Sequence, residues 1–407
     1  MKLYLHFGAG NIGRALAGPV FRRAGYEVVF VDAAPALVEA LQLRKQYRVV
    51  IKDTLPAGMP GQFDVGPVEG LAVHDVEAVT AAVARADLIG TAVGTAHLPG
   101  VLEAIAKGLP GRCGRPVSIL FCENLHGVAR MAREILAQHL PPDYPLKRQV
   151  GLVETSIGKM VPLMPLEVRQ RDPLEVWGEA YDTIIADRNG FVGSPPEGIA
   201  GLELKGCFTA YVERKLYVHN LGHAACACYG FLKGYRLISD AISDKEVLEQ
   251  TRIVMLETAQ ALCRRYPGEF DEAGQRAHVE DLLRRFGNRA LGDTVYRVGR
   301  DLPRKLAPGD RFIGGLRLVL AEGGDPLPLC RAIGAALCFA ATDESGKAFP
   351  ADVQFRERLR REGASALLCA HCGFEPRMDA FLLKRIMEAV DTLMRKYERQ
   401  KNEYSLA

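Results

Sequence analysis

The stretch HFGAGNIGRAL, residues 6–16, decides how the first half of this chain folds. Its first two residues are the last two of the apolar run KLYLHF (2–7). Three glycines follow in the pattern GxGxxG, at the point where a strand would be followed by a helix. Glycines at this spacing allow a tight turn and let backbone amides at a helix N-terminus approach a pyrophosphate. We therefore expect a dinucleotide site built from the residues Gly8, Ala9, Gly10, Asn11, Ile12 and Gly13.

A carboxylate at the end of the next apolar run supports this interpretation. The run EVVFVD (27–32) ends at Asp32, which lies 19 residues after Gly13. A carboxylate there accepts hydrogen bonds from the adenosine ribose hydroxyls and repels a 2′-phosphate, which favours NAD over NADP. The alternative is structural: the glycines only tighten a strand-to-helix turn, and Asp32 caps a helix.

The remainder of the first half alternates apolar, β-rich runs with helical patterns. The predicted strands are 2–7, 27–32, 47–51, 87–93, 117–121 and 150–154. Near-continuous apolar strands separated by helices are typical of a parallel sheet covered on both faces, so we predict a doubly wound, Rossmann-like α/β domain. Ligands of such sheets bind at the carboxyl ends of the strands, where we expect further cofactor contacts from Thr91, Ala92, Val93, Gly94 and Asn124.

The pattern changes after a loop rich in glycine and proline, NGFVGSPPEGIAG (189–201). From about residue 205 onward, amphipathic helical periodicity dominates, as in KEVLEQTRIVMLETAQALCRRY (245–266). We therefore predict two domains, an NAD-binding domain at 1–195 and a mainly α-helical substrate domain at 196–407. The last segment, DAFLLKRIMEAVDTLMRKYERQ, is predicted to be a closing surface helix.

Composition excludes several classes of protein. The 407 residues carry a formal net charge of +3 and show no interleaving of basic and aromatic residues, so no nucleic-acid partner is expected. No apolar stretch is long enough to span a bilayer, and the N-terminus lacks a signal-peptide core, so we expect a cytoplasmic protein with no membrane partner. The ten cysteines are expected to be reduced, and the CAHC pair at 369–372 lacks the further ligands of a zinc site.

A second motif carries candidate chemistry. In VERKLYVHNLGHAACACYG (212–230), the residues Lys215, Asn220 and His223 fall on one broad face of an α-helix, within about 140° at 100° per residue. His219 lies on the same arc, so the spacing alone does not choose between the two histidines. A buried, purely structural histidine is the alternative for either.

The motifs together resemble a known family. KLYVHNLGH is similar to the lysine, four residues, asparagine, two residues, histidine motif of the polyol-specific long-chain dehydrogenase/reductases, the mannitol dehydrogenase family. The likeness runs nearly end to end through LHFGAGNIGR, TAVG, CEN, DPLEV, VERKL, RVGR, RKL and GDR, and is strongest to members that act on mannitol 1-phosphate. It implies a metal-free, NAD-dependent enzyme that interconverts D-mannitol 1-phosphate and D-fructose 6-phosphate.

The resemblance also implies roles for individual residues. Lys215 would be the general base, while Asn220 and His223 would hydrogen-bond the reacting oxygen. A lysine with this role needs its pKa lowered by roughly two to three units through burial or a nearby cation. Glu154 matches a further active-site position, but VETSIGKMVP departs from the family pattern: Glu154 is longer than its counterpart, and Gly158–Lys159 replaces an Asp-Arg pair.

A phosphorylated substrate requires cations, and the run YRVGRDLPRKLAPGDR (296–311) supplies them. We expect the phosphate to bind Arg297, Arg300, Arg304 and Lys305, although a solvated basic face paired with Asp301 and Asp310 would give the same sequence. Two other functions stay open: a dehydrogenase of a free hexitol or hexuronate-derived acid, and a non-catalytic NAD-binding regulator. The expected partner is a small polyol or sugar phosphate, and the expected assembly is a monomer or small homo-oligomer.

Overall fold

A computed structural model describes residues 1–53, 55, 58, 60–125, 127–162 and 164–405, with side chains described as far as Lys396. The chain divides into two compact units, Met1–Phe208 and Thr209–Ala407, and each is described by itself below. The division expected between residues 195 and 196 lies before this boundary. The reason is β11 (Leu202–Lys205), which still pairs with β10 (Ile184–Asp187) of the first unit.

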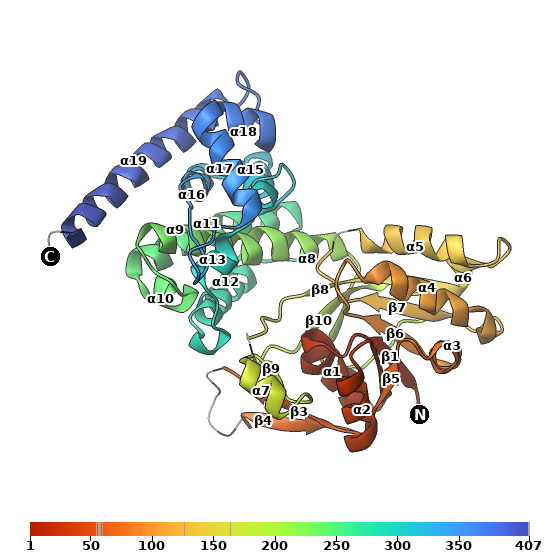
Figure 1. Ribbon diagram of the computed structural model, residues 1–407. Helices are drawn as coiled ribbons and strands as arrows, with labels where there is room; N and C mark the ends of the chain where they lie inside the picture. Colours follow the sequence, from red (N-terminus) through yellow and green to blue (C-terminus); the bar gives the residue numbers. More distant parts are fainter. Residues whose placement is uncertain (54, 56–57, 59, 126, 163, 406–407) are drawn as a thin grey trace. The chain divides into compact units, whose positions relative to one another are not determined.

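An eight-stranded sheet forms the centre of the first unit (Figure 1), in the order β11-β10-β8-β7-β6-β1-β2-β5. The six strands from β8 to β5 are parallel to their neighbours, and β10 runs antiparallel to β8. The bounds of these six strands are β1 (Leu3–Phe7), β2 (Glu27–Asp32), β5 (Val68–Ala72), β6 (Leu88–Thr91), β7 (Val117–Phe121) and β8 (Val150–Ile157). The order, with β1 at the centre, is that of a doubly wound dinucleotide fold, as predicted.

The two faces of this sheet carry separate hydrophobic clusters. Leu3, Leu5 and Phe7 of β1 pack on one face with residues of α3, α4 and α5, whereas Tyr4 packs on the other with residues of η1, α1 and α2. Side chains alternate across a strand, so a strand that is apolar throughout buries both of its faces. This is the physical reason why the apolar runs indicated a covered parallel sheet.

One part of the predicted topology is wrong. The run 47–51 forms strand β3 (Tyr47–Ile51), but it belongs to a separate three-stranded sheet with β4 (Gln62–Val65) and β9 (Val176–Gly178). Its place in the parallel sheet is taken by β5, which the sequence did not indicate. Gly70 interrupts the β5 pattern because a Cβ there would lie 2.9 Å from Cβ of Leu41, where α2 packs closely on the strand.

The remaining elements of the first unit are helical. Their bounds are η1 (Gly13–Ala17), α1 (Gly18–Arg23), α2 (Pro35–Arg44), α3 (Val76–Arg85), α4 (Leu98–Gly108), η2 (Pro110–Arg112), α5 (Val128–His139), α6 (Leu146–Gln149), α7 (Leu166–Arg171) and η3 (Arg188–Gly190). Helix η1 is a π-helical turn, and it follows directly on the glycine-rich loop.

The described part of the second unit consists of helices and connecting loops and contains no strand, apart from one bridge between Leu237 and Thr294. This confirms the predicted change of class. Its helices are α8 (Phe208–Arg214), η4 (Lys215–Asn220), α9 (Leu221–Leu232), α10 (Ile238–Ser243), α11 (Lys245–Arg265), α12 (Glu272–Phe286), η5 (Arg289–Leu291), α13 (Val295–Gly299), α14 (Leu302–Lys305), α15 (Arg311–Ala321), α16 (Leu327–Leu337), α17 (Pro350–Glu362), α18 (Ala364–Cys372) and α19 (Ala380–Ser405). Among the described helices, none has the length and apolar character that a membrane span requires.

A buried arginine stabilises one edge of the first unit. Arg112 is 2% exposed, and its guanidinium donates to the carbonyl oxygens of Val83 and Ala86 at 2.7 Å, Pro116 at 3.0 Å and Arg115 at 3.0 Å. These carbonyls lie at the end of α3 and in the approach to β7. One side chain thus joins two segments far apart in the sequence and satisfies backbone groups that no strand or helix pairs.

Replacing Arg112 with methionine should therefore destabilise the first unit. Arg112→Met keeps the aliphatic bulk but leaves these buried acceptors without donors, and we expect a loss of about 3 kcal/mol or more. Urea unfolding followed by fluorescence of Trp177, the single tryptophan of the chain, measures this unit directly. Arg133→Met, on the exposed side of α5, is the control and should change the midpoint little; equal effects would contradict the role of Arg112.

Candidate active site

The glycine-rich loop leaves strand β1 with the geometry that close packing requires. Gly8 has a φ of +98°, and a Cβ there would lie 2.5 Å from the carbonyl oxygen of Ala92, at the end of β6. A Cβ on Gly13 would lie 2.2 Å from the carbonyl oxygen of Gly8. Both positions require glycine for the fold itself.

Gly10 differs from its two neighbours. Its φ is not in the left-handed region, and a Cβ there would meet nothing within 4 Å. The fold does not need this glycine, so its absent side chain leaves the backbone open to an approaching group. Asn11 and Ile12 follow as the first helical residues, and the amide of Arg14 donates to the carbonyl of Gly10.

Asp32 holds the loop from the neighbouring strand. Its Oδ2 accepts a hydrogen bond from the amide of Ala9 at 2.7 Å, and its Oδ1 accepts from the amide of Ala34 at 2.9 Å. The carboxylate is only partly buried. Asp32 therefore orders the loop, although it does not cap α2, whose N-cap is Ala34. Its role in binding the ribose stays a prediction.

The end of β6 is held by a residue that the sequence reasoning missed. Glu123 is 7% exposed; its Oε2 accepts from the hydroxyl of Thr91 at 2.7 Å, and its Oε1 accepts from the amide of Val93 at 3.0 Å. Burial raises the pKa of this carboxyl. Glu123 is part of the CEN motif, of which only Asn124 is an expected cofactor contact; Asn124 is exposed at the next position.

The second motif lies on an irregular helix. Residues 215–220 form the π-helical turn η4, between α8 and α9. A π turn bonds residue i to i+5, so it holds one residue more per turn than the expected α-helix. If one residue is subtracted for the extra residue of the π turn, Asn220 and His223 project about 40° and 20° around the helix axis from Lys215. On a regular α-helix these angles would be about 140° and 80°. The turn thus brings the three residues onto a narrower arc than the sequence predicted.

Lys215 has the electrostatic environment that a base requires. Burial, and secondarily the neighbouring guanidinium of Arg311, lower its pKa from 10.5 to about 8. Arg311 itself is held by Asp310, whose Oδ1 accepts from its Nε at 2.7 Å. The lowering that the sequence analysis required is therefore present, and it has both of the expected causes.

The two histidines that the spacing left open are both kept neutral. Burial and the cations Arg297, Arg311, Lys305 and Arg285 lower the pKa of His223 to about 3. Its ring stacks on Phe286, with centroids 4.6 Å apart. The pKa of His219 is also well below its ordinary value, mainly through burial. Among Lys215, His219 and His223, only Lys215 changes its protonation near neutral pH.

The basic residues of the run 296–311 do not all line the same cavity. Arg297 and Arg300 line a cavity of about 1130 Å³ together with Arg236, which the sequence reasoning missed because it lies some sixty positions earlier. Arg304 is instead exposed and paired with Asp301 at 2.5 Å.

Within this cavity the arginines differ in their partners. Arg297 forms an ion pair with Asp293, whose Oδ2 lies 3.4 Å from Nε2 of His223. Arg300 lies over the rings of Tyr296 and Phe349, at 5.4 and 5.3 Å from their centroids. Lys305 is buried, with its ammonium donating to the carbonyl of Arg300. The cavity is therefore linked to His223 through one carboxylate and one guanidinium.

Glu154 and its neighbours lie in the first unit. Oε1 of Glu154, on β8, accepts from the amide of Ala129 at 3.1 Å, in the first turn of α5. Lys159 is buried, and its ammonium donates to the carbonyl oxygens of Glu179 at 2.7 Å and Tyr181 at 2.5 Å. The departure from the family pattern at Lys159 thus has a structural use, because the lysine joins the end of β8 to the segment after β9.

The cysteines form no evident metal site. All ten are free thiols, and the described residues contain no group of three or more histidine, cysteine, aspartate or glutamate side chains placed to hold a metal ion. Burial raises the pKa of Cys372, in the CAHC segment, to about 12.

Models of one known protein family match both units of the chain. The mannitol dehydrogenase Rossmann domain model matches residues 2–198, and the mannitol dehydrogenase C-terminal domain model matches residues 208–396. The chain belongs to the mannitol dehydrogenase family. Family members named mannitol-1-phosphate 5-dehydrogenase are similar over most of their length. The protein of Brevibacillus brevis is 35% identical, with 85% of this chain and 88% of that protein covered, and the protein of Bacillus licheniformis is 33% identical, with 93% and 97% covered.

Solved structures of dehydrogenases share the fold. A substrate-free D-sorbitol dehydrogenase superposes with a TM-score of 0.77 at 17% identity, covering 98% of this chain and 94% of the other. Mannitol 2-dehydrogenase of Pseudomonas fluorescens, in a ternary complex with NAD and D-mannitol, gives 0.69 at 16% identity with the same coverage. The predictions of the family, the fold class and an oxidoreductase of the polyol dehydrogenase class are confirmed.

Proposed function

We propose that this protein is an NAD-dependent oxidoreductase that interconverts D-mannitol 1-phosphate and D-fructose 6-phosphate. The observation that carries the proposal is the single titrating base of the motif: Lys215, with a pKa of about 8, among histidines that stay neutral. The names of its family relatives support the substrate. A cytoplasmic location and a monomeric or small homo-oligomeric state stay predictions from the sequence.

The residues of the first unit fit NAD. Gly10 leaves an open approach to the backbone at a helix N-terminus, which suits a pyrophosphate, while Gly8 and Gly13 keep the turn tight around it. The carboxylate of Asp32 lies beside the loop, where it would accept hydrogen bonds from the ribose hydroxyls and repel a 2′-phosphate. Thr91, Ala92, Val93 and Gly94 complete the site, positioned by Glu123, with Asn124 after the next strand. Bound NAD would accept a hydride from the alcohol carbon, and NADH would return it.

The chain's own residues handle the proton. Neutral Lys215 accepts the hydroxyl proton as the alcohol is oxidised, and in reduction its ammonium donates that proton to the ketone oxygen. Asn220 and the neutral imidazole of His223 hydrogen-bond the reacting oxygen and so hold it against the lysine. Because the pKa of His223 is about 3, its imidazole does not compete for the proton at neutral pH. Glu154, which belongs to the first unit, stays a prediction from the family resemblance.

The substrate phosphate is proposed to bind in the arginine-lined cavity. Arg300 and Arg236 have no carboxylate partner among the described residues, whereas Arg297 already pairs with Asp293. Guanidinium forks suit phosphate oxygens, so the first two are the principal ligands and Arg297 assists. Lys305, buried behind Arg300, adds positive charge, and Arg304 contributes only at longer range because Asp301 and Asp310 neutralise it.

The substrate assignment is tested by oxidation of NADH at 340 nm. We expect turnover with fructose 6-phosphate to exceed that with fructose or fructuronate by at least 100-fold in kcat/KM, and NADPH to support little turnover. Lys215→Met should lose at least 1000-fold in kcat while still binding NADH, because only the proton acceptor is removed. Turnover restricted to an unphosphorylated ketose or uronate would replace the substrate, and full activity of Lys215→Met would favour the non-catalytic regulator.

The pH dependence tests the base separately. Alcohol oxidation needs neutral Lys215, so its kcat/KM should rise with pH and level off above about 8; ketone reduction needs the ammonium and should fall above the same pH. Arg311→Gln should move this midpoint upward, because the cation that helps to lower the pKa is removed. Lys305→Met, which removes another buried lysine of pKa about 8, should leave the midpoint in place. A midpoint that follows Lys305 instead would transfer the role of the base.

The phosphate site is tested by comparing two variants of similar size. Arg300→Met should raise KM for fructose 6-phosphate at least 20-fold and change the low turnover of free fructose little, since only the ester uses the guanidinium. Arg304→Met should change KM less than threefold, because Asp301 already neutralises that side chain. Equal losses for both substrates would show that Arg300 supports the fold rather than the phosphate.

A further inference from the structure

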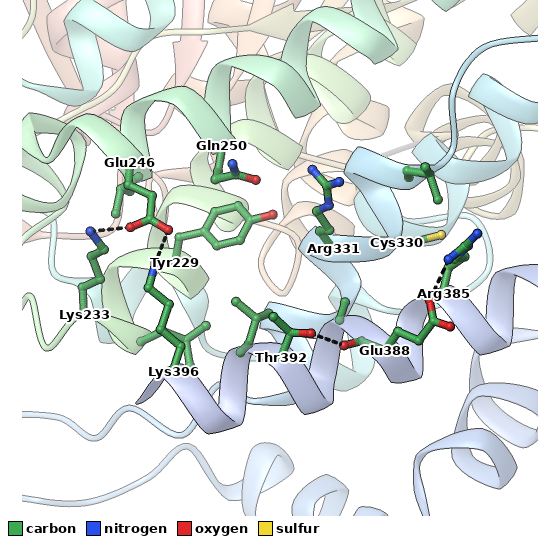
Figure 2. A pocket seen from close by; sticks show the side chains of 15 residues that line it. Tyr229, Lys233, Glu246, Gln250, Cys330, Arg331, Arg385, Glu388, Thr392 and Lys396 are labelled. Carbon is green, nitrogen blue, oxygen red and sulfur yellow. Dashed lines mark hydrogen bonds and ion pairs between the residues drawn. The ribbon is translucent and has the colours of Figure 1, made fainter. Parts of the chain in front are cut away.

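A second cavity lies in the helical unit, apart from the residues discussed above. It has a volume of about 440 Å³ and is bounded by α9, α11, α16 and α19 (Figure 2). None of its lining residues belongs to the proposed catalytic or phosphate sites. Tyr229 lies six residues after His223 on α9, so the two side chains point about 120° apart around that helix.

Close helix packing fixes the wall of this cavity. A Cβ on Gly334 of α16 would lie 2.9 Å from Cβ of Ala389 on α19, so these helices approach at near-backbone contact. Beside this contact, Leu232, Val247, Leu327 and Leu393 provide apolar surface. The cavity therefore has a fixed apolar wall of a size that suits a small organic molecule.

Most charged groups at its mouth are already neutralised. Lys233 pairs with Glu246 at 2.9 Å, and Lys396 pairs with the same carboxylate. Arg385 pairs with Glu388 at 2.8 Å. The Lys396–Glu246 pair joins α19 to α11, the Lys233–Glu246 pair joins the end of α9 to α11, and the Arg385–Glu388 pair lies within α19. All three leave their side chains little spare capacity for a ligand.

Three polar groups in the cavity have no such partner among the described side chains. The hydroxyl of Tyr229 is buried without a hydrogen-bond partner, and the residue is 6% exposed. Arg331 forms no ion pair, and the amide of Gln250 forms no hydrogen bond, with any described side chain. Figure 2 shows the phenol of Tyr229 directed between Gln250 and Arg331. A buried hydroxyl normally has a partner, so an unpartnered one beside a free guanidinium indicates a missing acceptor.

We propose that this cavity binds a small organic anion, with a carboxylate or phosphate group held by Arg331, Tyr229 and Gln250 and an apolar body against α16 and α19. All three groups can donate hydrogen bonds, and the guanidinium carries the compensating charge. Burial raises the pKa of Tyr229, which keeps its hydroxyl protonated as a donor. The apolar lining favours a ligand with a hydrocarbon chain over inorganic phosphate.

Calorimetric titration of the full-length protein with octanoate and with hexyl phosphate tests the site, with octanol as the neutral control. We expect saturable one-to-one binding of at least one anion and none of the alcohol at the same concentration. Arg331→Met and Tyr229→Phe should each weaken binding at least tenfold. Arg395→Met, an exposed position on α19 that does not line the cavity, should leave it unchanged.

Folding and the other anion site are controlled separately. Tyr229→Phe removes only an unpartnered hydroxyl, so it should unfold at or above the wild-type temperature while losing the ligand. Arg300→Met should retain octanoate binding, which separates this cavity from the proposed phosphate site. Binding that is absent up to 10 mM, that is equal in all variants, or that is lost only in Arg300→Met would overturn the proposal. So would a dimer in sedimentation that Leu393→Asp dissociates, because a second copy would then cover the cavity.

Discussion

The burial of positive charge organises the helical unit. Lys215, Arg311, Lys305 and Arg297 all have lowered pKa values with burial as the largest cause, and they lie close enough to His223 or to one another to contribute electrostatically. Gathering cations away from water costs free energy unless something compensates for it. The fold supplies partial compensation through Asp310 and Asp293, and burial lowers the pKa values of both Lys215 and Lys305 to about 8, so that these two amines can release a proton near neutral pH.

The basic residues of the run 296–311 differ in whether a carboxylate neutralises them, and this decides which of them can bind an anion. Arg304 stays in solvent and is neutralised by two aspartates, so the alternative of a solvated, salt-bridged face is correct for that residue. Arg300 lies against aromatic rings, which support a guanidinium without neutralising it. A cation kept this way retains its charge for an anionic ligand. The difference depends on the partners each arginine meets in space, and the sequence of the run does not contain it.

Local chemistry made much of the fold predictable. The run at 117–121 is a strand over the expected residues, and the glycines at 8 and 13 pack as the turn requires, because these features depend on neighbours in sequence. β5 was missed because Gly70 serves the packing of α2, and β3 was assigned to the wrong sheet because its partners β4 and β9 are not evident locally. Glu123 and Arg236 were missed for the same reason: their importance lies in contacts with residues elsewhere in the chain.

The π turn at 215–220 changes how the catalytic motif should be compared between proteins. The side chains of the motif lysine, asparagine and histidine project in similar directions because the π turn contains one residue more than a turn of a regular α-helix. A chain with the same letters on an uninterrupted α-helix would direct them over a much wider arc. An alignment that matches the letters but closes that extra position would therefore equate side chains that face different directions. The motif consequently describes a backbone conformation as much as a set of residue types.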